Sequence, residues 1–485
     1  MTQNSIRSRR FLSGTWLINL VGGLTLGIPG VCSVCTASEE PAEPENPSAE
    51  PVEKVSFIHQ VAPILVRNCQ ACHGPKAAES NYRLDSFESL MTAGDYDMAP
   101  VTGGELDDSE LYSLITAEDA DQRMPNNGDQ LSDEDIQLIA RWIEQGAEFD
   151  GADPATPLEQ QLPRPSYPPA PEVYPASIPM AALAFSSDGQ QLFASGYHEL
   201  TVWDANEGTI LRRLGNLPQR VYGIDVSADG EWLAVAGGAP GVTGDAWVIR
   251  VADGSVVSFL PRQRDVYFDV AFSPDGKRVA LASADGSVCI ADPATGEQLQ
   301  LIENHSDWVH DVAWNTDGTR LASSSRDKAA KVFDAASGEL LATYSGHGAE
   351  VFSVQFMPDG VHVASGGADN KVHVWKIEDA AKVGEMAGFG KQVTSLIVYS
   401  EHVLAGSADQ TVRQFKVEDR AHVRSLEEHP DWVLSLAIDG SGQRLAAGSF
   451  DGSVSVWNFE NGELVKRFQA FPAKPMEPET APDES

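Results

Sequence analysis

The sequence predicts a small all-α domain followed by a larger all-β domain, a propeller of seven four-stranded sheets. Two observations support this fold class. A motif recurs about every 42 residues between positions 180 and 471, and strands of alternating apolarity at such a period indicate one small sheet per repeat. Between residues 54 and 150 the apolar residues instead follow a helical spacing on both sides of a cysteine pair.

The length and composition are those of a chain with several globular domains and a strongly negative net charge. The chain has 485 residues, 42% apolar and 22% charged, and at roughly 100–200 residues per domain we expect two to four domains. The 34 Lys and Arg against 71 Asp and Glu give a net charge of −37. Such a surface repels nucleic acid and anionic membranes and favours partners with basic patches. Five cysteines in so long a chain exclude a disulfide scaffold.

Residues 1–37 are expected to be a signal peptide. A basic start at residues 7–10 is followed by an uncharged run, and small residues at Cys35 and Ala37 suit a cut after position 37. Two alternatives stay open. The uncharged run is long enough to span a membrane without being cleaved, and a lipoprotein cut before Cys32 or Cys35 would also anchor the chain.

Three further segments have the composition of linkers or tails. Residues 38–53 hold six Glu, four Pro and no basic residue, so we expect an acidic disordered spacer. Residues 151–179 hold nine Pro and are predicted to form a semi-rigid linker. Residues 472–485 are again rich in Pro and acid and are predicted to be a loose tail. These boundaries leave two folded blocks, 54–150 and 180–471.

The block at 180–471 contains seven repeats. One position, at the end of a short apolar strand, is equivalent in all seven repeats: Trp203, Ile249, Ala291, Phe333, Trp375, Phe415 and Trp457. Successive equivalent residues are 46, 42, 42, 42, 40 and 42 residues apart. Five repeats carry an Asp-Gly turn upstream, at Asp188, Asp229, Asp275, Asp317 and Asp359. Repeats one, two and six depart from the pattern: Tyr197 replaces a turn Asp, residues 236–244 are inserted, and the Asp-Gly turn is missing near Ser400.

These repeats resemble the WD-repeat family, whose members fold as β-propellers. The resemblance covers most of residues 180–471 and implies that a His and an Asp are hydrogen-bonded inside a blade, together with a strand Ser such as Ser365 and the Trp. The matching pairs, each 22 residues apart, are His305/Asp327, His347/Asp369 and His429/Asp451. These histidines could also be metal ligands or general bases, but their recurrence in separate blades favours the structural role.

Cys69-Gln-Ala-Cys72-His73 matches the attachment motif of c-type haem. Two thiols three positions apart lie on one helical turn, where both can bond the vinyl groups of one haem, and His73 can then ligate the iron. A disulfide or half of a zinc site is the alternative. After signal removal the sequence has no second cysteine pair for zinc, and a thioredoxin-like site would need a βαβ context. Cys289 is expected to be a small buried strand residue.

Helices are predicted on both sides of this motif. Phe57, Val61, Ile64 and Leu65 form one apolar stripe leading into it. At the other end, Ser132 caps a helix that stops at Gly146 and whose apolar face is Ile136, Ile139, Trp142 and Ile143. With Arg83-Leu-Asp85 and Met124-Pro125, these segments resemble the planctomycete-type cytochrome c domain over roughly residues 54–150. The resemblance implies one haem c with His and Met ligation and a role in electron transfer.

The sixth iron ligand is predicted to be Met124, because this residue lies just before the last helix. Met98, His59 or an open site are the alternatives, since a Met in such a position usually serves packing. The predicted site is therefore Cys69, Cys72, His73 and Met124. His73 and Met124 are the expected metal ligands, and no catalytic residue is predicted.

The sequence favours an exported, periplasmic or cell-surface haem protein that transfers single electrons and docks partners on its propeller. The expected partners are a redox protein with a basic patch and a protein bound to the propeller, with membrane contact only if residues 1–37 stay uncleaved or are lipidated. Two alternatives stay open: a haem-containing scaffold or redox sensor, and an oxidoreductase with a substrate site in the propeller. Trp308 and Trp432 are either contact residues or packing at a blade edge.

Overall fold

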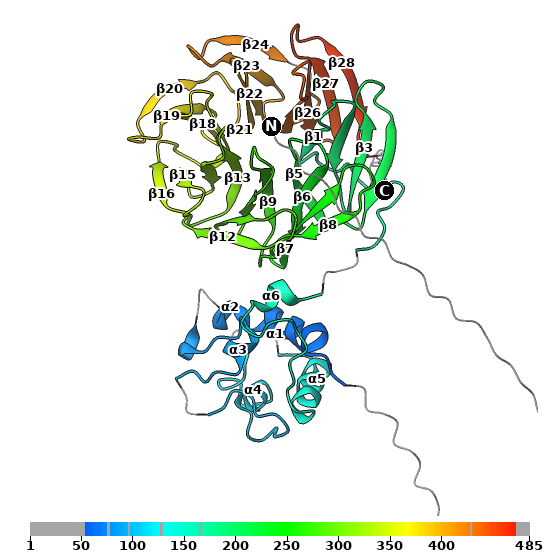
Figure 1. Ribbon diagram of the computed structural model, residues 1–485, viewed down its shortest axis with the longest axis vertical. Helices are drawn as coiled ribbons and strands as arrows, with labels where there is room; N and C mark the ends of the chain where they lie inside the picture. The colour runs from blue at the N-terminus through cyan, green and yellow to red at the C-terminus, as the bar shows by residue number, and fades with distance from the viewer. Residues whose placement is uncertain are drawn as a thin grey trace, which may run out of the picture. The chain divides into compact units, whose positions relative to one another are not determined.

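The computed structural model describes residues 54–74, 78–95, 98–126, 130–163, 167–426 and 429–471. They form a short helical region followed by a seven-bladed β-propeller (Figure 1), so the predicted fold class is confirmed. The predicted signal peptide, acidic spacer and C-terminal tail lie outside the described residues. Within the described part of the chain, no helix is long and apolar enough to cross a membrane.

The helical region consists of short helices joined by loops. A π-helical turn at Phe57–Val61 continues into α1 (Ala62–Asn68), and then follow α2 (Gln70–His73), a 3₁₀ turn at Glu79–Asn81, α3 (Phe87–Leu90), α4 (Glu110–Ile115), α5 (Asp133–Glu144) and α6 (Leu158–Gln161). The predicted last helix is confirmed in its cap and its buried face. The Ser132 hydroxyl accepts a hydrogen bond from the backbone N–H of Asp135 at 3.1 Å, and Trp142 packs on Phe57 at 5.0 Å between ring centroids.

Part of the segment predicted as a linker is folded onto its neighbours. Leu158 in α6 is fully buried in the helical core, and its backbone N–H donates to the Asp85 carbonyl at 2.8 Å. Tyr174 is buried against propeller residues, and its hydroxyl donates to Glu199. The helical region therefore extends as far as Gln161, beyond the expected boundary at residue 150.

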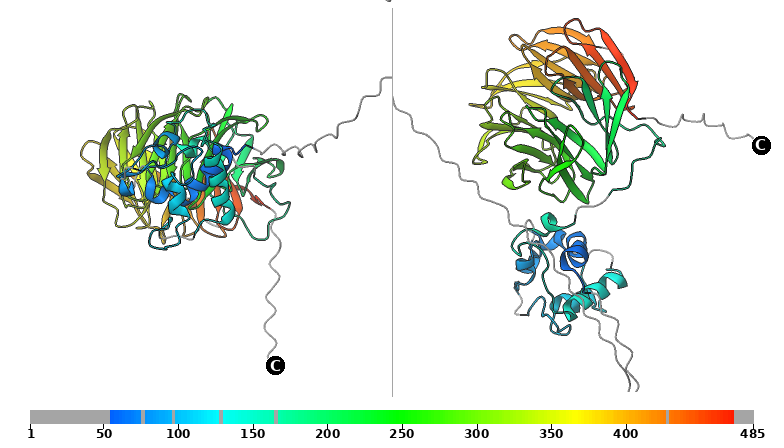
Figure 2. Two further views of the ribbon diagram at one scale, coloured as in Figure 1. Left: turned by 90° about the horizontal axis from the view of Figure 1, so that it is seen from below. Right: turned by 45° about the vertical axis from the view of Figure 1, so that its right-hand side comes forward.

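Each propeller blade is an antiparallel sheet of four consecutive strands. The blades are β1–β4 (Leu183–Phe185, Gln191–Ser195, Glu199–Asp204, Ile210–Gly215), β5–β8 (Arg220–Val226, Trp232–Ala239, Thr243–Arg250, Val256–Phe259), β9–β12 (Tyr267–Phe272, Val279–Ser283, Ser287–Ala291, Gln298–Glu303), β13–β16 (Val309–Trp314, Arg320–Ser325, Ala330–Asp334, Leu340–Tyr344), β17–β20 (Val351–Phe356, His362–Gly367, Val372–Lys376, Lys382–Met386), β21–β24 (Val393–Tyr399, His402–Ser407, Val412–Lys416, His422–Leu426) and β25–β28 (Val433–Ile438, Arg444–Ser449, Ser453–Asn458, Leu464–Gln469). The first strand of a blade lies near the centre and the fourth at the rim (Figure 1), and Figure 2 gives two further views.

The irregular repeats still complete their blades. Repeat six has no Asp-Gly turn, but Ser400 takes a positive φ of 51° and closes a tight turn between β21 and β22. The Gly-rich insertion of repeat two lengthens the hairpin of β6 and β7. Cys289 is fully buried on β11, as expected, and this burial raises the pKa of its thiol to about 12.

Two of the three predicted His–Asp pairs are hydrogen-bonded. They are His305–Asp327 at 2.8 Å and His347–Asp369 at 2.9 Å, each from Nδ1 to Oδ2. The third pair was expected to be bonded as well, and it is not. The Nδ1 of His429 lies 3.0 Å from the Ser449 hydroxyl, and no hydrogen bond to Asp451 is formed among the described residues. Equal spacing in the sequence therefore does not fix the orientation of the ring.

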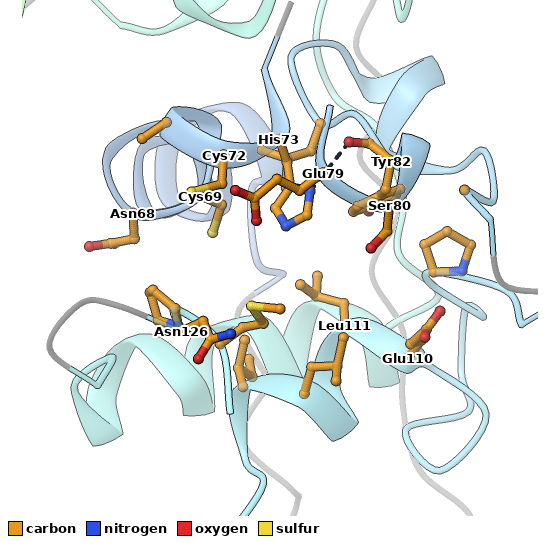
Figure 3. A pocket seen from close by; sticks show the side chains of 18 of the residues that line it. Asn68, Cys69, Cys72, His73, Glu79, Ser80, Tyr82, Glu110, Leu111 and Asn126 are labelled. Carbon is orange, nitrogen blue, oxygen red and sulfur yellow. Dashed lines mark hydrogen bonds between the residues drawn. The ribbon is translucent and has the colours of Figure 1, made fainter. Parts of the chain in front are cut away.

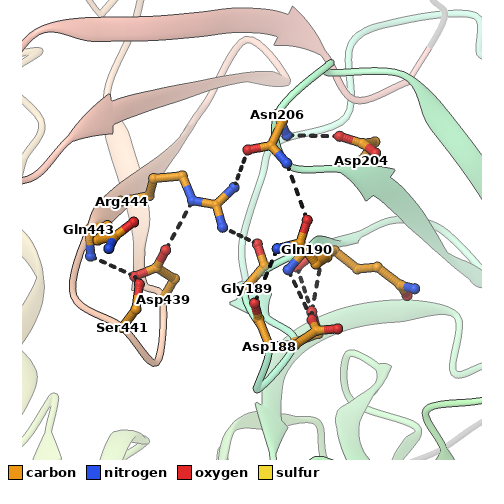
Figure 4. A network of polar contacts seen from close by, with 11 residues as sticks. Asp188, Gly189, Gln190, Asp204, Asn206, Asp439, Ser441, Gln443 and Arg444 are labelled. Carbon is orange, nitrogen blue, oxygen red and sulfur yellow. Dashed lines mark hydrogen bonds and ion pairs between the residues drawn. The ribbon is translucent and has the colours of Figure 1, made fainter.

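Every blade takes its four strands from one continuous segment, so blades seven and one are held together by contacts between separate segments. A backbone hydrogen bond joins them, from the N–H of Met180 to the Ser449 carbonyl at 3.1 Å. Arg444, the first residue of β26, adds side-chain contacts to blade one (Figure 4). Its Nε donates to Asp439 of the same blade at 2.9 Å, and its Nη1 donates to Asn206 of blade one at 2.7 Å. Its Nη2 donates to the Gly189 carbonyl, in the first Asp-Gly turn. Asp439 is only 1% exposed, so this ion pair is buried.

We expect Arg444→Met to lower the free energy of unfolding of the propeller by about 3 kcal/mol, because the substitution leaves Asp439 buried without its cation. Arg320→Met is the matched control. Arg320 also reaches a turn carbonyl of the next blade, that of Gly360 at 3.4 Å, and its loss should cost only about 1 kcal/mol. Urea unfolding followed by tryptophan fluorescence measures both. Equal losses for the two variants would contradict a special role for the closing seam.

Candidate cofactor site

The two cysteines and the histidine of the motif lie on one helical turn. The backbone N–H groups of Cys72 and His73 both donate to the Cys69 carbonyl, at 3.2 and 3.0 Å. Cys72 is exposed and Cys69 is half-buried. Burial, together with the neighbouring Cys72, raises the pKa of the Cys69 thiol to about 12. The two cysteines therefore share one short helical turn, with Cys72 at the surface and Cys69 partly covered.

The ring of His73 is oriented by a backbone carbonyl. Its Nδ1 lies 3.3 Å from the Tyr82 carbonyl oxygen, so a proton on Nδ1 is donated there and the lone pair of Nε2 is left available. Figure 3 shows the imidazole projecting from α2 into a cavity, with Leu111 on the opposite side. The segment around Tyr82 is itself anchored. The Tyr82 hydroxyl donates to the Leu90 carbonyl at 3.0 Å, and the backbone N–H of Leu84 donates to the backbone carbonyl of His73 at 2.9 Å.

The cavity has a volume of about 700 Å³, within the range of cofactor pockets. Four aliphatic side chains form its apolar wall: Leu84, Leu111, Leu114 and Ile115. Its polar lining includes amides and acids, with the hydroxyl residues Ser80 and Tyr82 beside them: Asn68, Gln122, Asn126, Glu79, Glu110 and Asp121. No lysine or arginine belongs to the lining among the residues that the structure describes. The cavity thus has an aliphatic wall and a polar lining rich in amides and acids.

Met124 lines the same cavity as the two cysteines and His73. Its backbone N–H donates to the Leu114 carbonyl at 3.0 Å, which ties its loop to α4. The alternative ligands are elsewhere. Met98 is 52% exposed, His59 is exposed with its Nδ1 2.9 Å from the Ser56 hydroxyl, and neither lines the cavity. Cys69, Cys72, His73 and Met124 are therefore brought together, and Met98 and His59 are not.

Sequence reasoning missed the residues that complete the cavity. Leu111, Leu114 and Ile115 follow a helical i, i+3, i+4 pattern, so the periodicity of α4 could have indicated this wall. The Tyr82 carbonyl could not have been found, because any residue offers a backbone carbonyl.

Comparison with known proteins identifies both regions. Residues 69–128 match the planctomycete cytochrome C family. Residues 254–292, 296–334, 338–376 and 420–458 match the WD domain, G-beta repeat, family. The chain joins a planctomycete cytochrome c domain to a WD-repeat propeller. Each matched stretch starts with the fourth strand of one blade and ends with the third strand of the next, so the four stretches contain the first three strands of blades three, four, five and seven. The structure adds blade one, the first three strands of blades two and six, and the fourth strands of blades five and seven.

A curated relative shares part of the chain. An uncharacterized WD repeat-containing protein of Synechocystis sp. is 30% identical over 119 residues, which is 24% of this chain and 33% of the relative. The chain therefore matches about a third of that protein's length.

The cytochrome c family implies covalently bound haem c, and the donors around the cavity fit that group. Two thiols, an imidazole whose Nδ1 is held by the Tyr82 carbonyl, and a thioether line one cavity with an aliphatic wall. These are the attachment groups and the axial ligand types that haem c uses.

The two motif cysteines should differ in reactivity when the chain is produced without haem. The thiolate is the reactive form, so at pH 8 exposed Cys72 should be alkylated by iodoacetamide at least tenfold faster than Cys69 or Cys289, whose thiol pKa values are raised to about 12. Peptide mass spectrometry over a time course measures the three rates. Equal rates for Cys69 and Cys72 would show that Cys69 is not shielded by this fold.

Proposed function

We propose that this chain is an exported c-type haem protein that transfers single electrons and uses its propeller to dock protein partners. The observation that carries the proposal is the convergence of Cys69, Cys72, His73 and Met124 on one cavity. Cys69, Cys72 and His73 are neighbours on one helical turn, and Met124 comes to the same cavity from about fifty residues further along the chain. The comparisons support the coarser statement that a cytochrome c domain is joined to a WD-repeat propeller.

In this proposal the Cys69 and Cys72 sulfurs would hold haem c through thioether bonds, and His73 Nε2 and Met124 Sδ would be the iron ligands. When bound, the haem iron supplies a one-electron couple between its ferrous and ferric states. The Tyr82 carbonyl holds the His73 ring in one tautomer and one orientation. The aliphatic side chains of Leu84, Leu111 and Ile115 line the cavity and would exclude water from part of it.

Export is proposed from the sequence and from the chemistry. The basic, then uncharged, N-terminal segment suits a signal peptide, and haem c attachment in this class of protein takes place outside the cytoplasm on an unfolded chain. We therefore propose a periplasmic or cell-surface location, with a membrane anchor if the N-terminal segment is retained or lipidated.

The propeller offers two exposed tryptophans as contact candidates. Trp308 is 39% exposed and Trp432 is 37% exposed. Trp308 also packs on its own blade, where the Arg326 guanidinium lies 4.6 Å above its ring. Trp432 packs against Lys391 of blade six, which lies 5.4 Å from its ring. More than a third of each residue thus remains available to a partner, which suits aromatic anchors at a protein interface.

Replacement of Met124 tests the ligation and the redox role together. Met124→His should keep a six-coordinate haem but lower its reduction potential by on the order of 0.1 V, because imidazole stabilises ferric iron more than a thioether does. Met124→Ala should abolish the weak far-red band of Met-ligated ferric haem and admit carbon monoxide. Met98→Ala is the control and should change neither property, since its side chain is outside the cavity.

Spectroelectrochemistry and ferric absorption spectra measure these outcomes. Loss of the far-red band in Met98→Ala, with the band retained in Met124→Ala, would reverse the ligand assignment. Rapid binding of carbon monoxide by the wild type would indicate an open iron site and would favour a sensor over an electron carrier.

Electron transfer to a basic partner should depend strongly on salt. The net charge of −37 steers a positively charged partner, and salt screens that attraction over roughly 8 Å at physiological ionic strength. Between 20 and 500 mM NaCl the bimolecular rate constant with a small basic redox protein should therefore fall, by roughly tenfold or more. Stopped-flow mixing measures it. A rate that does not change with ionic strength would argue against docking through this acidic surface.

A further inference from the structure

Blade five differs from its neighbours at one position of the repeat, the fourth residue after the turn aspartate. In blade four this residue is Lys331, whose Nζ lies 4.0 Å from Asp327. In blade six it is Arg413, which pairs with its own turn aspartate at 3.1 Å. In blade five it is His373. The two neighbouring blades thus place a fixed positive charge beside the turn carboxylate, and blade five places an imidazole there.

This imidazole is buried and incompletely partnered. The His373 side chain is 4% exposed, and its Nδ1 lies 2.7 Å from the Tyr344 hydroxyl. Its Nε2 has no hydrogen-bond partner among the described residues. Burial and the stacked ring of His347 lower the pKa of His373 to about 4. At neutral pH the ring is uncharged and does not replace the cation of the neighbouring blades.

The turn carboxylate is also incompletely satisfied. Asp369 Oδ2 lies 2.9 Å from His347 Nδ1 and 3.7 Å from His373 Nε2. Its Oδ1 is buried and lacks a hydrogen-bond partner in the described part of the chain. Glu385 Oε2 lies 4.0 Å from His373 Nε2. The Glu385 carboxylate also forms ion pairs with Lys371 and Lys382. Two neighbouring side chains thus each hold a buried polar atom without a partner among the described residues, Asp369 Oδ1 and His373 Nε2. Such atoms cost folding free energy, and proteins usually avoid them.

We propose that blade five binds a divalent transition-metal ion through His347, Asp369 and His373. One donor atom from each residue lies within 4.8 Å of the other two. Two imidazoles and a carboxylate are a ligand set that suits Zn²⁺, and Glu385 is placed to complete it. The ion supplies beside Asp369 the positive charge that Lys331 supplies in blade four.

The second nitrogen of each histidine is already positioned for this role. Metal-bound histidines normally donate a hydrogen bond from the ring nitrogen that does not touch the metal. His373 Nδ1 can donate to the Tyr344 hydroxyl at 2.7 Å, and His347 Nε2 can donate to the Ser365 hydroxyl at 2.8 Å. His347 then needs only the tautomer with its proton on Nε2, so metal binding requires no net loss of a proton from either ring.

Zinc retention by the full-length protein tests the proposal. Protein treated with a chelator, dialysed against Zn²⁺ and desalted should keep about one zinc per chain, and its thermal midpoint should rise with zinc. His373→Lys, which reproduces the residue of blade four, should remain folded and lose that zinc. His362→Gln is the matched control: it removes another His–Asp pair of blade five, with Nδ1 2.6 Å from Asp359, and should keep the zinc.

A wild type that retains no zinc, or a His373→Lys variant that retains as much as the wild type, overturns the proposal. X-ray absorption at the zinc edge of the wild type gives an answer that requires no variant. It should report two imidazoles with oxygen ligands and no sulfur. A sulfur ligand would place the zinc at cysteines instead and would equally overturn the site in blade five.

Discussion

A cavity of about 700 Å³ is the feature on which the helical region depends. Protein interiors are packed about as densely as organic crystals, and this region has only short helices around its small core. An apolar space of this size inside so small a core needs a group to pack against. The proposed haem supplies it and would tie α2, through Cys69 and Cys72, to the loop that carries Met124. In this account the cofactor is part of the core as well as the redox centre.

The core of the propeller, in contrast, is formed by its own repeated strands. Third strands such as β11 and β19 are buried along most of their length, and Arg444 closes the ring at the seam between the last and first blades. Because the repeated strands form the core, the residue at a single position can differ from blade to blade. The residue beside the turn carboxylate is Lys331 in blade four, His373 in blade five and Arg413 in blade six, and this variation gives blade five its candidate metal site.

Much of this organisation could be predicted because it depends on local spacing. Residues three positions apart in a helix lie on one turn, which places Cys69 and Cys72 together. Ser132 marks the start of a helix, and the 42-residue period sets the extent of each blade. Features that depend on distant contacts could not be predicted. The folding of Leu158 onto the helical core, the carbonyl of Tyr82 that orients His73 and the turn of His429 toward Ser449 leave no mark in local sequence. They arise from packing between segments.

The intact mass of the denatured chain shows whether Cys69 and Cys72 hold haem covalently, as we propose. The full-length protein is produced together with haem maturation factors and unfolded in acid before electrospray mass spectrometry. We expect the mass of the polypeptide plus one haem, and the mass of the polypeptide alone when both cysteines are replaced by alanine. Cys289→Ala should leave the haem content unchanged. A wild-type chain whose denatured mass lacks haem, with all the haem recovered in the organic extract, would contradict the account.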